Sequence, residues 1–561
     1  MLTHDTLTRR DALLALGAAA LLSPAAAAAT PPEVDRSVVE RNDRAVERYL
    51  VNQVTVQTSP YLGSVPDDYL LHSAGSAGAV IEACAAALVC PQSRDHSDPS
   101  TLLDRIRLAA GFLERSQSSE GFIDLLSTNF NSPPDTGFVV HNVATAAALG
   151  KLYGNPALVD ALRPFLVKAG AGLAAGGIHT PNHRWVVSSA LAQINDIFPN
   201  KAYIKRIDQW LAEGVDIDDD GQFIERSTVT YNTVCDRAFT VLAAKLKRPE
   251  LLDAVRRNLN AMRYLIHPDG EVVTEVSHRQ DQFTRGTMAG YWFPASYLAA
   301  HDNDPVMAGL LRVMPPDAPR LSTLLEYPEL AAPLAHATPV PEDYEKEFPL
   351  LSLARIRRGG RDATILLSGS SRFFSGRNGG AVIESVRFAT SFFGKGQFVP
   401  QTSVKAGESY MLRQSLEAPY YQPLSPPQKV DAKNWAALRA KRRQTQICRL
   451  DQSATVTERD WGFHVRIESK GTAGVPLAVE IALRGGGKLE GCHPAPHAPD
   501  AWILESGYAT YAVNGNRFRI GPGTAPHLET QLRGAEPRLP ATSLYLTGYT
   551  PFDHSLEIRY E

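Results

Sequence analysis

Apolar residues recur with a helical period along the first part of the chain, from about residue 34 to residue 325. They fall at positions i, i+3, i+4 and i+7, which places them on one face of an α-helix. Gly, Pro, Asn and Asp separate the periodic segments, and no fixed-period sequence repeat is present. The pattern predicts helices in successive hairpins, as in an α/α toroid or solenoid. The expected helices are residues 37–54, 74–89, 102–117, 139–152, 157–174, 185–197, 202–213, 228–246, 251–265 and 287–301.

Two longer polar segments, residues 129–138 and 275–281, interrupt the helical pattern. Loops of this polarity and length usually bind a ligand. In a toroid such loops line one mouth of the central cavity, so we expect both segments to contribute to a binding site.

After residue 348 the hydrophobic period becomes two, which is typical of β-strands. Many short strands separated by Gly, Asn and Pro indicate an antiparallel β-sandwich. A helix is expected as an insertion at residues 431–441, and the clearest strands are residues 363–367, 381–383, 465–467, 477–483 and 544–547. The composition between the two regions shifts to Pro, Ala, His and Glu, which indicates a linker.

The chain is therefore predicted to be a multidomain α and β protein, with an N-terminal (α/α) toroid followed by a C-terminal antiparallel β-sandwich. A length of 561 residues is too great for one ordinary core and agrees with two large domains. We expect a signal peptide at residues 1–29, the toroid at 30–326, a linker at 327–347 and the sandwich at 348–561.

The N-terminal segment has the features of an export signal. Arg9 and Arg10 precede an apolar run to Leu22, and small residues follow at positions 25–29. This order resembles a twin-arginine signal cut near Ala29, and the alternative is an ordinary Sec signal; both imply a periplasmic or extracellular protein. The apolar run is too short for a stable membrane span, and no other segment has the pattern of one.

Composition adds few constraints. The net charge of −3 gives no global argument for a nucleic-acid or anionic-membrane partner. Five cysteines in an exported chain leave at least one thiol free. Cys448 and Cys492 are candidates for a pair across the sheet, and Cys235, in an apolar helical context, is expected to be buried packing rather than a nucleophile.

The densest group of functional side chains lies at residues 177–185, before an apolar helical run. Gly-Gly and Thr-Pro are turn sequences, so His179, Asn182 and His183 are expected on a loop that enters a helix. A second polar run, residues 225–232, follows one helical hairpin later and contains Tyr231. We expect Asn182, His183 and Tyr231 to meet in space.

These three residue types suit β-elimination from a sugar polymer that contains uronic acid. The reaction needs a group that neutralises the carboxylate, a base for the α-proton and an acid for the departing oxygen. Asn182 is suited to bind the carboxylate, and His183 titrates near neutrality. Tyr231 can donate a proton to the leaving oxygen, and nearby cations would let its phenolate also act as base.

The side chains expected to bind the acidic polysaccharide surround these three positions. Arginines suit bidentate carboxylate binding, and aromatic rings stack on sugars. The candidates are Arg184, Trp185, Arg237, His278 and Arg279, with Arg226 and Arg285 as further cations. Each has a plainer interpretation: Asn-His as a helix cap, Tyr231 as a half-buried core tyrosine, and the arginines as a solvated face.

The architecture and the Asn182-His183 pair followed by Tyr231 resemble the toroid-plus-sandwich polysaccharide lyases, the heparinase II/III-like enzymes and oligoalginate lyases. His183 and Tyr231 are 231 − 183 = 48 residues apart, a spacing similar to that of the family. The resemblance implies that Asn182 neutralises the carboxylate and that His183 and Tyr231 act as base and acid. Family members often add a His or Tyr from the sandwich, for which Tyr410 is the candidate, with Arg413 beside it.

The resemblance also raises the question of a metal. Many of these lyases carry a histidine zinc site in the sandwich, but this chain has no His between His336 and His464, and its later histidines lack ligand spacing. The acidic run at residues 216–221 resembles part of a calcium loop, yet Ser227 stands where an EF-hand requires Glu. We therefore expect no required cofactor and an acidic turn that leaves room for a structural divalent cation.

Two other functions remain open at this point. A glycoside hydrolase on a toroid would need paired carboxylates, for which the chain offers Asp67, Asp68, Asp124, Asp135 and Glu225. A non-catalytic glycan-binding protein would use Trp185, Tyr291 and Trp292 as stacking platforms. The sequence leaves open the uronic acid, the linkage, endo or exo action and the oligomeric state.

Overall fold

The computed structural model describes residues 28–561 apart from residues 335 and 497. The chain forms two compact units. The first holds the chain up to Gly214 together with Val241–Pro249 and Pro319–Pro333, and the second holds Val215–Thr240, Glu250–Ala318 and Leu334–Glu561. Nearly all of the predicted export signal, residues 1–27, lies outside the described residues and stays a prediction.

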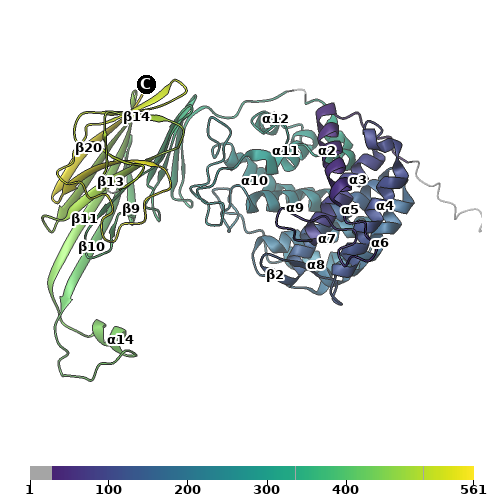
Figure 1. Cartoon of the computed structure of the whole chain (residues 1–561), viewed down its shortest axis with the longest axis horizontal. Coiled ribbons are helices and arrows are strands. Elements are labelled where there is room, and N and C mark those ends of the chain that lie inside the picture. Colours follow the sequence, from purple (N-terminus) through teal and green to yellow (C-terminus); the bar gives the residue numbers. More distant parts are fainter. Residues whose placement is uncertain (1–27, 335, 497) are drawn as a thin grey trace, which may run out of the picture. The chain divides into compact units, whose positions relative to one another are not determined.

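The helical region follows the periodicity of the sequence closely (Figure 1). The helices are α2 (Arg36–Asn52), α3 (Ala74–Val89), α4 (Pro99–Ser116), α5 (Pro133–Leu152), α6 (Pro156–Ala175), α7 (Asn182–Ile197), α8 (Lys201–Leu211), α9 (Tyr231–Leu246), α10 (Leu252–Met262), α11 (Trp292–His301), α12 (Pro305–Leu311) and α13 (Leu321–Glu326). Short 3₁₀ turns are η1 (Arg94–Ser97), η2 (Pro249–Leu251), η3 (Met288–Tyr291) and η4 (Pro328–Ala331).

One predicted loop is largely regular structure. Residues 129–138 were expected to be irregular, but Asn129–Ser132 forms strand β2, which pairs with β1 (Ile123–Leu125), and α5 begins at Pro133. The Ser132 side chain accepts from the Asp135 N–H and caps the helix. Proline is favoured in the first turn of a helix, where its missing N–H costs nothing, so the prolines here start a helix instead of ending one.

The first unit has the two layers of an α/α toroid. Helices α3, α5 and α7 pack against one another in succession, while α4, α6 and α8 form a second set of neighbours. Residues on all sides of α5 are buried, whereas α8 buries only Tyr203 and Ile207. A helix that is apolar all round belongs to an inner layer and an amphipathic helix to the surface, so burial confirms the helical-hairpin architecture.

The C-terminal region consists of two sheets. The first contains β14 (Lys488–Glu490), β17 (Ala509–Val513), β18 (Asn516–Gly521), β20 (Phe552–Tyr560), β12 (Gly462–Gly471), β11 (Gln444–Arg459), β10 (Ser409–Tyr421) and β9 (Thr402–Ala406), in that order. The second contains β15 (His493–Pro494), β16 (Ala501–Ile503), β19 (Thr542–Tyr549), β13 (Pro476–Leu483), β7 (Ala381–Thr390), β6 (Phe374–Asn378), β5 (Arg361–Leu366), β4 (Leu353–Arg358) and β3 (Asp343–Phe348), with β8 (Gly396–Gln397) paired to β7.

The two sheets enclose one hydrophobic core, and neighbouring strands are antiparallel except for β16 and β19. Core residues such as Ile365, Val465 and Leu546 come from strands of both sheets. The antiparallel β-sandwich is thus confirmed, although its first strand begins at Asp343, inside the predicted linker. The β10–β11 hairpin extends beyond the sheet and carries the inserted helix α14 (Trp435–Ala440) near its end (Figure 1).

Cys84, Cys90, Cys448 and Cys492 are free thiols. Cys448 and Cys492 are therefore not joined, and Cys235 is 1% exposed in α9, as expected for packing. No helix within residues 28–334, 336–496 and 498–561 is long and apolar enough to cross a membrane.

Candidate active site

Asn182 is the first residue of α7, one turn earlier than the predicted helix start. Pro181 occupies the cap position with no capping side chain, so Asn182 is not the helix cap. Its side-chain N–H group donates to Thr180 Oγ1 at 3.1 Å, and the residue is 1% exposed. The carboxamide is thus held in a fixed orientation at the start of an inner helix.

His183 lies beside Asn182 in the same helical turn and is 7% exposed. The exposed His179 approaches it edge-on, with ring centroids 4.5 Å apart, and Phe138 packs on it at 6.4 Å. The two imidazoles form a contiguous pair that leads from the buried His183 to the surface. His179, which the sequence placed on the same loop, therefore belongs with the candidate base.

Arg184 and Trp185 have structural roles in the same turn. Arg184 forms a 3.2 Å ion pair with Glu213, and its guanidinium stacks on the Trp185 ring at 4.5 Å. Trp185 is 0% exposed. The prediction that Trp185 is a sugar-stacking platform is wrong, because a ring without accessible surface has no face for a ligand. Arg184 is committed to Glu213 and supports the turn.

Tyr231 begins α9, where its backbone N–H donates to Ser227 Oγ at 3.0 Å. Its hydroxyl accepts a 3.1 Å hydrogen bond from the Gln280 side-chain amide, and Arg279 lies over its ring at 5.1 Å. Because the hydroxyl oxygen accepts from Gln280, its own proton stays available for another acceptor. Arg279 thus places a positive charge beside the phenol.

The segment before Tyr231 pairs with the polar loop at residues 275–281. Arg279 lies 3.6 Å from Glu225, and the backbone N–H of His278 donates to the Arg226 carbonyl at 2.7 Å. Partial burial and the Arg226 cation lower the pKa of His278, which favours its neutral imidazole. Arg226 has a φ of 46°, and a non-glycine residue in this region is strained, as is common at functional sites.

Buried polar groups fix the two segments to each other. Asp281 accepts from the Ser277 hydroxyl at 3.0 Å and from the Val229 N–H at 3.1 Å. The Thr228 N–H donates to Ser277 Oγ at 3.1 Å. Asp281, Ser277 and Thr228 are all nearly inaccessible to solvent. This network holds Arg279 and Gln280 in place beside Tyr231, so the geometry around the phenol is preorganised.

Other predicted ligand residues lie elsewhere. Tyr410 is 2% exposed in the sandwich and donates to Glu345 at 2.6 Å, so its role as a sandwich-derived substrate ligand is wrong. Burial and Glu345 raise its pKa, which keeps the phenol protonated.

Arg237 is half-buried in α9, and its contact with substrate stays a prediction. Tyr291 is fully buried and donates to the Thr228 carbonyl, so it is not a stacking platform.

Four of the five carboxylates offered for a hydrolase, all but Asp68, have local structural roles. Asp67 accepts from two backbone N–H groups of its own turn, and Asp124 accepts from the Asn131 N–H at 2.6 Å. Asp135 accepts from the Ser132 hydroxyl, which caps α5. Glu225 is paired with Arg279. These contacts leave the four carboxylates poorly suited to act as a catalytic pair.

The acidic run at residues 216–221 is a turn that anchors the sandwich within the second unit. Asp218 accepts from the Gln222 N–H at 2.9 Å, and Asp220 accepts from the N–H groups of Leu350 and Leu351. Among the described residues, no group of three or more His, Cys, Asp or Glu side chains is arranged to hold a metal ion.

Gln280 was not singled out from the sequence, although it lies within the predicted binding loop. Its neighbours His278 and Arg279 have ionisable side chains and were therefore assigned to substrate binding, whereas a neutral amide stands out less in a sequence. Only the pairing of this loop with residues 225–231 brings Gln280 to the Tyr231 hydroxyl.

No protein-family model and no curated protein matches the chain. Among solved structures it is similar to the chondroitin AC lyase of Streptomyces coelicolor A3 in complex with chondroitin sulphate, with a TM-score of 0.56 and 14% identity over 94% of this chain and 79% of that one. Heparinase III gives a TM-score of 0.51 and 10% identity over 94% and 90% of the two chains. A mutant heparan sulfate lyase from Pedobacter heparinus has a TM-score of 0.51 and 11% identity, over 95% of this chain and 84% of that one.

These structures share one architecture with this chain along nearly its whole length. At such low identity the likeness establishes the fold alone. The toroid-plus-sandwich fold, predicted from the hydrophobic periods of the sequence, is thereby confirmed.

Proposed function

We propose that this protein is a polysaccharide lyase that cleaves a glycan containing uronic acid by β-elimination. The observation that carries the proposal is the environment of Tyr231. Its hydroxyl accepts from Gln280 and retains its own proton, and a guanidinium lies over its ring. A phenol held in this way suits proton transfer to a departing glycosidic oxygen. The shared fold of chondroitin AC lyase and heparinase III supports the same reaction class.

In the proposed reaction a base removes the C5 proton of the uronate. The resulting electron pair forms the C4–C5 double bond, the C4–O bond breaks, and the leaving oxygen takes a proton. We assign carboxylate neutralisation to Asn182, proton abstraction to His183 and protonation of the leaving oxygen to Tyr231. Arg279 adds positive charge where the carboxylate and the departing oxygen become more negative.

A hydrolase is the second candidate, and the structure argues against it. Hydrolysis requires two carboxyl groups on either side of the glycosidic bond. Asp67, Asp124 and Asp135 already accept hydrogen bonds within their own turns and caps, and Glu225 is paired with Arg279. A β-elimination needs no such pair, so the polar groups around Tyr231 fit the lyase better.

The substrate class follows from the charges. Arg279 and the Asn182 carboxamide suit a carboxylate, so we propose an acidic polysaccharide or oligosaccharide as the partner. Export to the periplasm or beyond would bring the protein to such a polymer, and the twin-arginine-type segment is the basis for that part of the proposal.

The test is a panel of acidic glycans offered to the purified chain: alginate, heparan sulfate, chondroitin sulfate, hyaluronan, pectin, ulvan and a glucuronate-bearing plant gum. We expect ultraviolet absorbance from a 4,5-unsaturated uronide on at least one polymer, without incorporation of oxygen from labelled water. New reducing ends that carry labelled oxygen and no chromophore would establish a hydrolase. A folded protein that changes no polymer on the panel would contradict the proposal.

A further inference from the structure

A polar cavity lies within the second unit, between the 271–285 segment and the sandwich. Its volume is about 300 Å³, at the lower end of the range for small-molecule sites. The helical part of this unit contributes residues within 271–275 and 283–285, and the sandwich contributes side chains from β6, β7 and the positions around Arg372 and Arg484. Residues 539–541 complete the lining, so the cavity is formed by four segments far apart in sequence.

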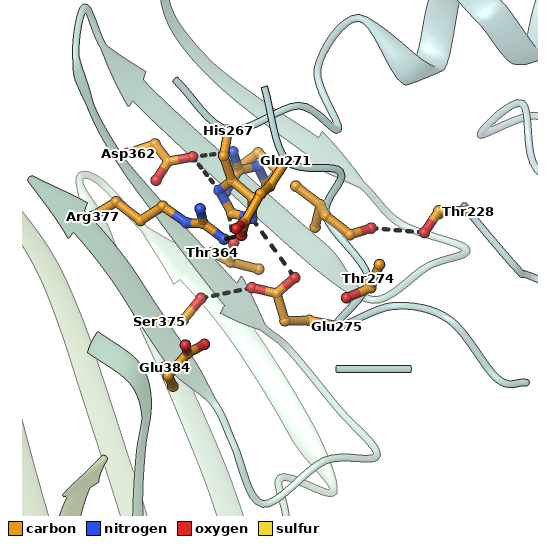
Figure 2. Close-up of polar contacts among 12 residues, drawn as sticks. Thr228, His267, Glu271, Thr274, Glu275, Asp362, Thr364, Ser375, Arg377 and Glu384 are labelled. Atoms are coloured by element: carbon orange, nitrogen blue, oxygen red, sulfur yellow. Dashed lines mark hydrogen bonds and ion pairs between the residues drawn. The ribbon is translucent and has the colours of Figure 1, made fainter. Parts of the chain in front are cut away.

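The carboxylates in this cavity are already neutralised. Glu271 is held by Arg377 at 2.8 Å and by Arg484 at 3.0 Å, and Arg484 also pairs with Glu384 at 2.6 Å. Burial alone would raise the pKa of Glu271, but the two guanidinium groups outweigh it and hold the pKa below its usual range. Glu275 accepts from the Ser375 hydroxyl at 2.9 Å (Figure 2).

Arg372 differs from the other arginines of the lining. Within the described part of the chain it forms no ion pair, whereas Arg377 and Arg484 each contact carboxylates and Arg285 lies 3.9 Å from Glu384. It is half-buried, and burial together with the neighbouring Arg387 lowers its pKa. The lining thus contains a partly desolvated cation that no carboxylate of the described residues contacts, although Glu384, Glu480 and Glu536 act on it at longer range.

The position of Arg372 is fixed by an aromatic ring. Its guanidinium carbon lies 3.7 Å from the ring centroid of Phe283. Phe283 has a φ of 59°, a costly conformation for a bulky residue, so the surrounding loop must hold it there. Stacking leaves the edge of the guanidinium, where its N–H donors lie, directed away from the ring and available to a planar anion.

A buried hydrogen-bond network adjoins the cavity, because His267 lies 4.0 Å from Glu275. His267 binds Asp362 at 2.6 Å, and Asp362 also binds Arg355, with all three side chains almost inaccessible to solvent. Burial would raise the pKa of Asp362, but His267 and Arg355 hold it well below its usual range, so this carboxylate remains charged. Figure 2 shows His267 and Asp362 on one side of Glu275 and Arg377. Such a network preorganises the lining instead of adapting to a ligand.

We propose that this cavity is an anion subsite that receives a carboxylate or sulfate ester of a sugar unit, with Arg372 as its principal ligand. Arg372 supplies paired N–H donors, while the carboxylates of Glu275 and Glu384 accept from sugar hydroxyls. The site selects an acidic ring because an uncharged sugar leaves Arg372 without a counter-charge. Its role in binding the polymer rests on the proposed function, but anion binding itself does not.

The test is titration of the full chain with sodium sulfate, D-glucuronate and D-glucose, followed by calorimetry. We expect sulfate, glucuronate or both to bind with Kd in the millimolar range, and glucose not to bind. Arg372→Ala should weaken binding about tenfold or more, as expected for a hydrogen bond to a charged group. Comparison of the two anions tells a sulfate ester from a carboxylate.

Three further variants control the result. Arg372→Lys keeps the charge without the planar fork and should give an intermediate Kd. Arg533→Ala removes an exposed sandwich arginine outside the cavity and should bind like the parent. Arg279→Ala should retain the binding, which separates this cavity from the Tyr231 site. Thermal melting establishes that each variant is folded.

The proposal is overturned if neither anion binds, or if Arg372→Ala binds as the parent does while Arg279→Ala does not. These outcomes are separate from the fate of the lyase assignment. A protein that binds anions through Arg372 but forms no unsaturated product has the subsite without the proposed activity.

Discussion

The Gln280 side-chain amide donates a 3.1 Å hydrogen bond to the hydroxyl oxygen of Tyr231. This bond orients the phenol so that its own proton points to another acceptor. Gln280→Ala should therefore lower kcat about three- to tenfold, the range of one ordinary hydrogen bond, with little change in KM. Gln280→Glu should lower kcat further, because a carboxylate beside the hydroxyl accepts its proton. Equal activity of both variants and the parent in steady-state kinetics would show that Gln280 has no such role.

Arg279 lies over the Tyr231 ring and also pairs with the Glu225 carboxylate. Its effect on activity and its effect on stability can be measured separately. Arg279→Met should reduce kcat/KM about tenfold or more and lower the free energy of unfolding by about 1–3 kcal/mol, because Glu225 is 8% exposed and loses a cation 3.6 Å away. The double variant with Glu225→Gln should regain stability but not activity. Glu225→Gln alone should remain active. Loss of all activity in that single variant would instead favour a hydrolase.

Asp362 is expected to make the second unit sensitive to acid. Its pKa is held below the ordinary value by His267 and Arg355, so its contribution to stability is present above about pH 4, the unfolded value, and is lost as the pH falls below it. Asp362→Asn should cost about 3–5 kcal/mol in denaturant unfolding at neutral pH. Asp553→Asn, which removes the exposed partner of Arg466, is the matched control and should cost less than about 1 kcal/mol. Equal losses in the two variants would refute this account.

Asp236 is expected to have the opposite pH dependence. It is fully buried in α9, neither carboxyl oxygen has a hydrogen-bond partner in the described structure, and burial raises its pKa well above the usual value. Stability from the neutral carboxyl is present below about pH 4 and is lost as the pH rises toward the raised pKa, because only the unfolded chain then ionises. Asp236→Asn should therefore melt above the parent at pH 8, and the difference should shrink toward pH 4. A variant that melts below the parent at pH 8 would contradict the raised pKa.

The helices and strands could be predicted because their periods lie within the local sequence. Even so, the period does not distinguish inner from outer helices. Trp185 and Tyr291 were expected to stack on sugars, but both are fully buried, since α7 is covered on nearly all sides and Tyr291 lies on the buried face of η3. Prolines were taken as loop signals at residues 133 and 134, where they start α5.

Part of the candidate site could also be predicted, because some of its residues belong to local polar runs. Tyr231 and Arg279 belong to polar runs that stand out in the sequence, and the structure brings these two together. Gln280 and Arg372 depend on long-range packing, because their partners lie 49 and 89 residues away at Tyr231 and Phe283. No local pattern signals such contacts, so the anion cavity could not be inferred from residue order.

The most direct test of the lyase assignment is the Tyr231→Phe variant, assayed by ultraviolet absorbance on whichever acidic glycan the parent protein cleaves. Removing one hydroxyl leaves the ring beneath Arg279 intact, so substrate binding measured by calorimetry should stay within about threefold of the parent. We predict that formation of the unsaturated product falls by at least about a thousandfold, because the departing oxygen loses its proton donor. A Tyr231→Phe variant that binds the glycan and releases the unsaturated product at the parent rate would contradict the account.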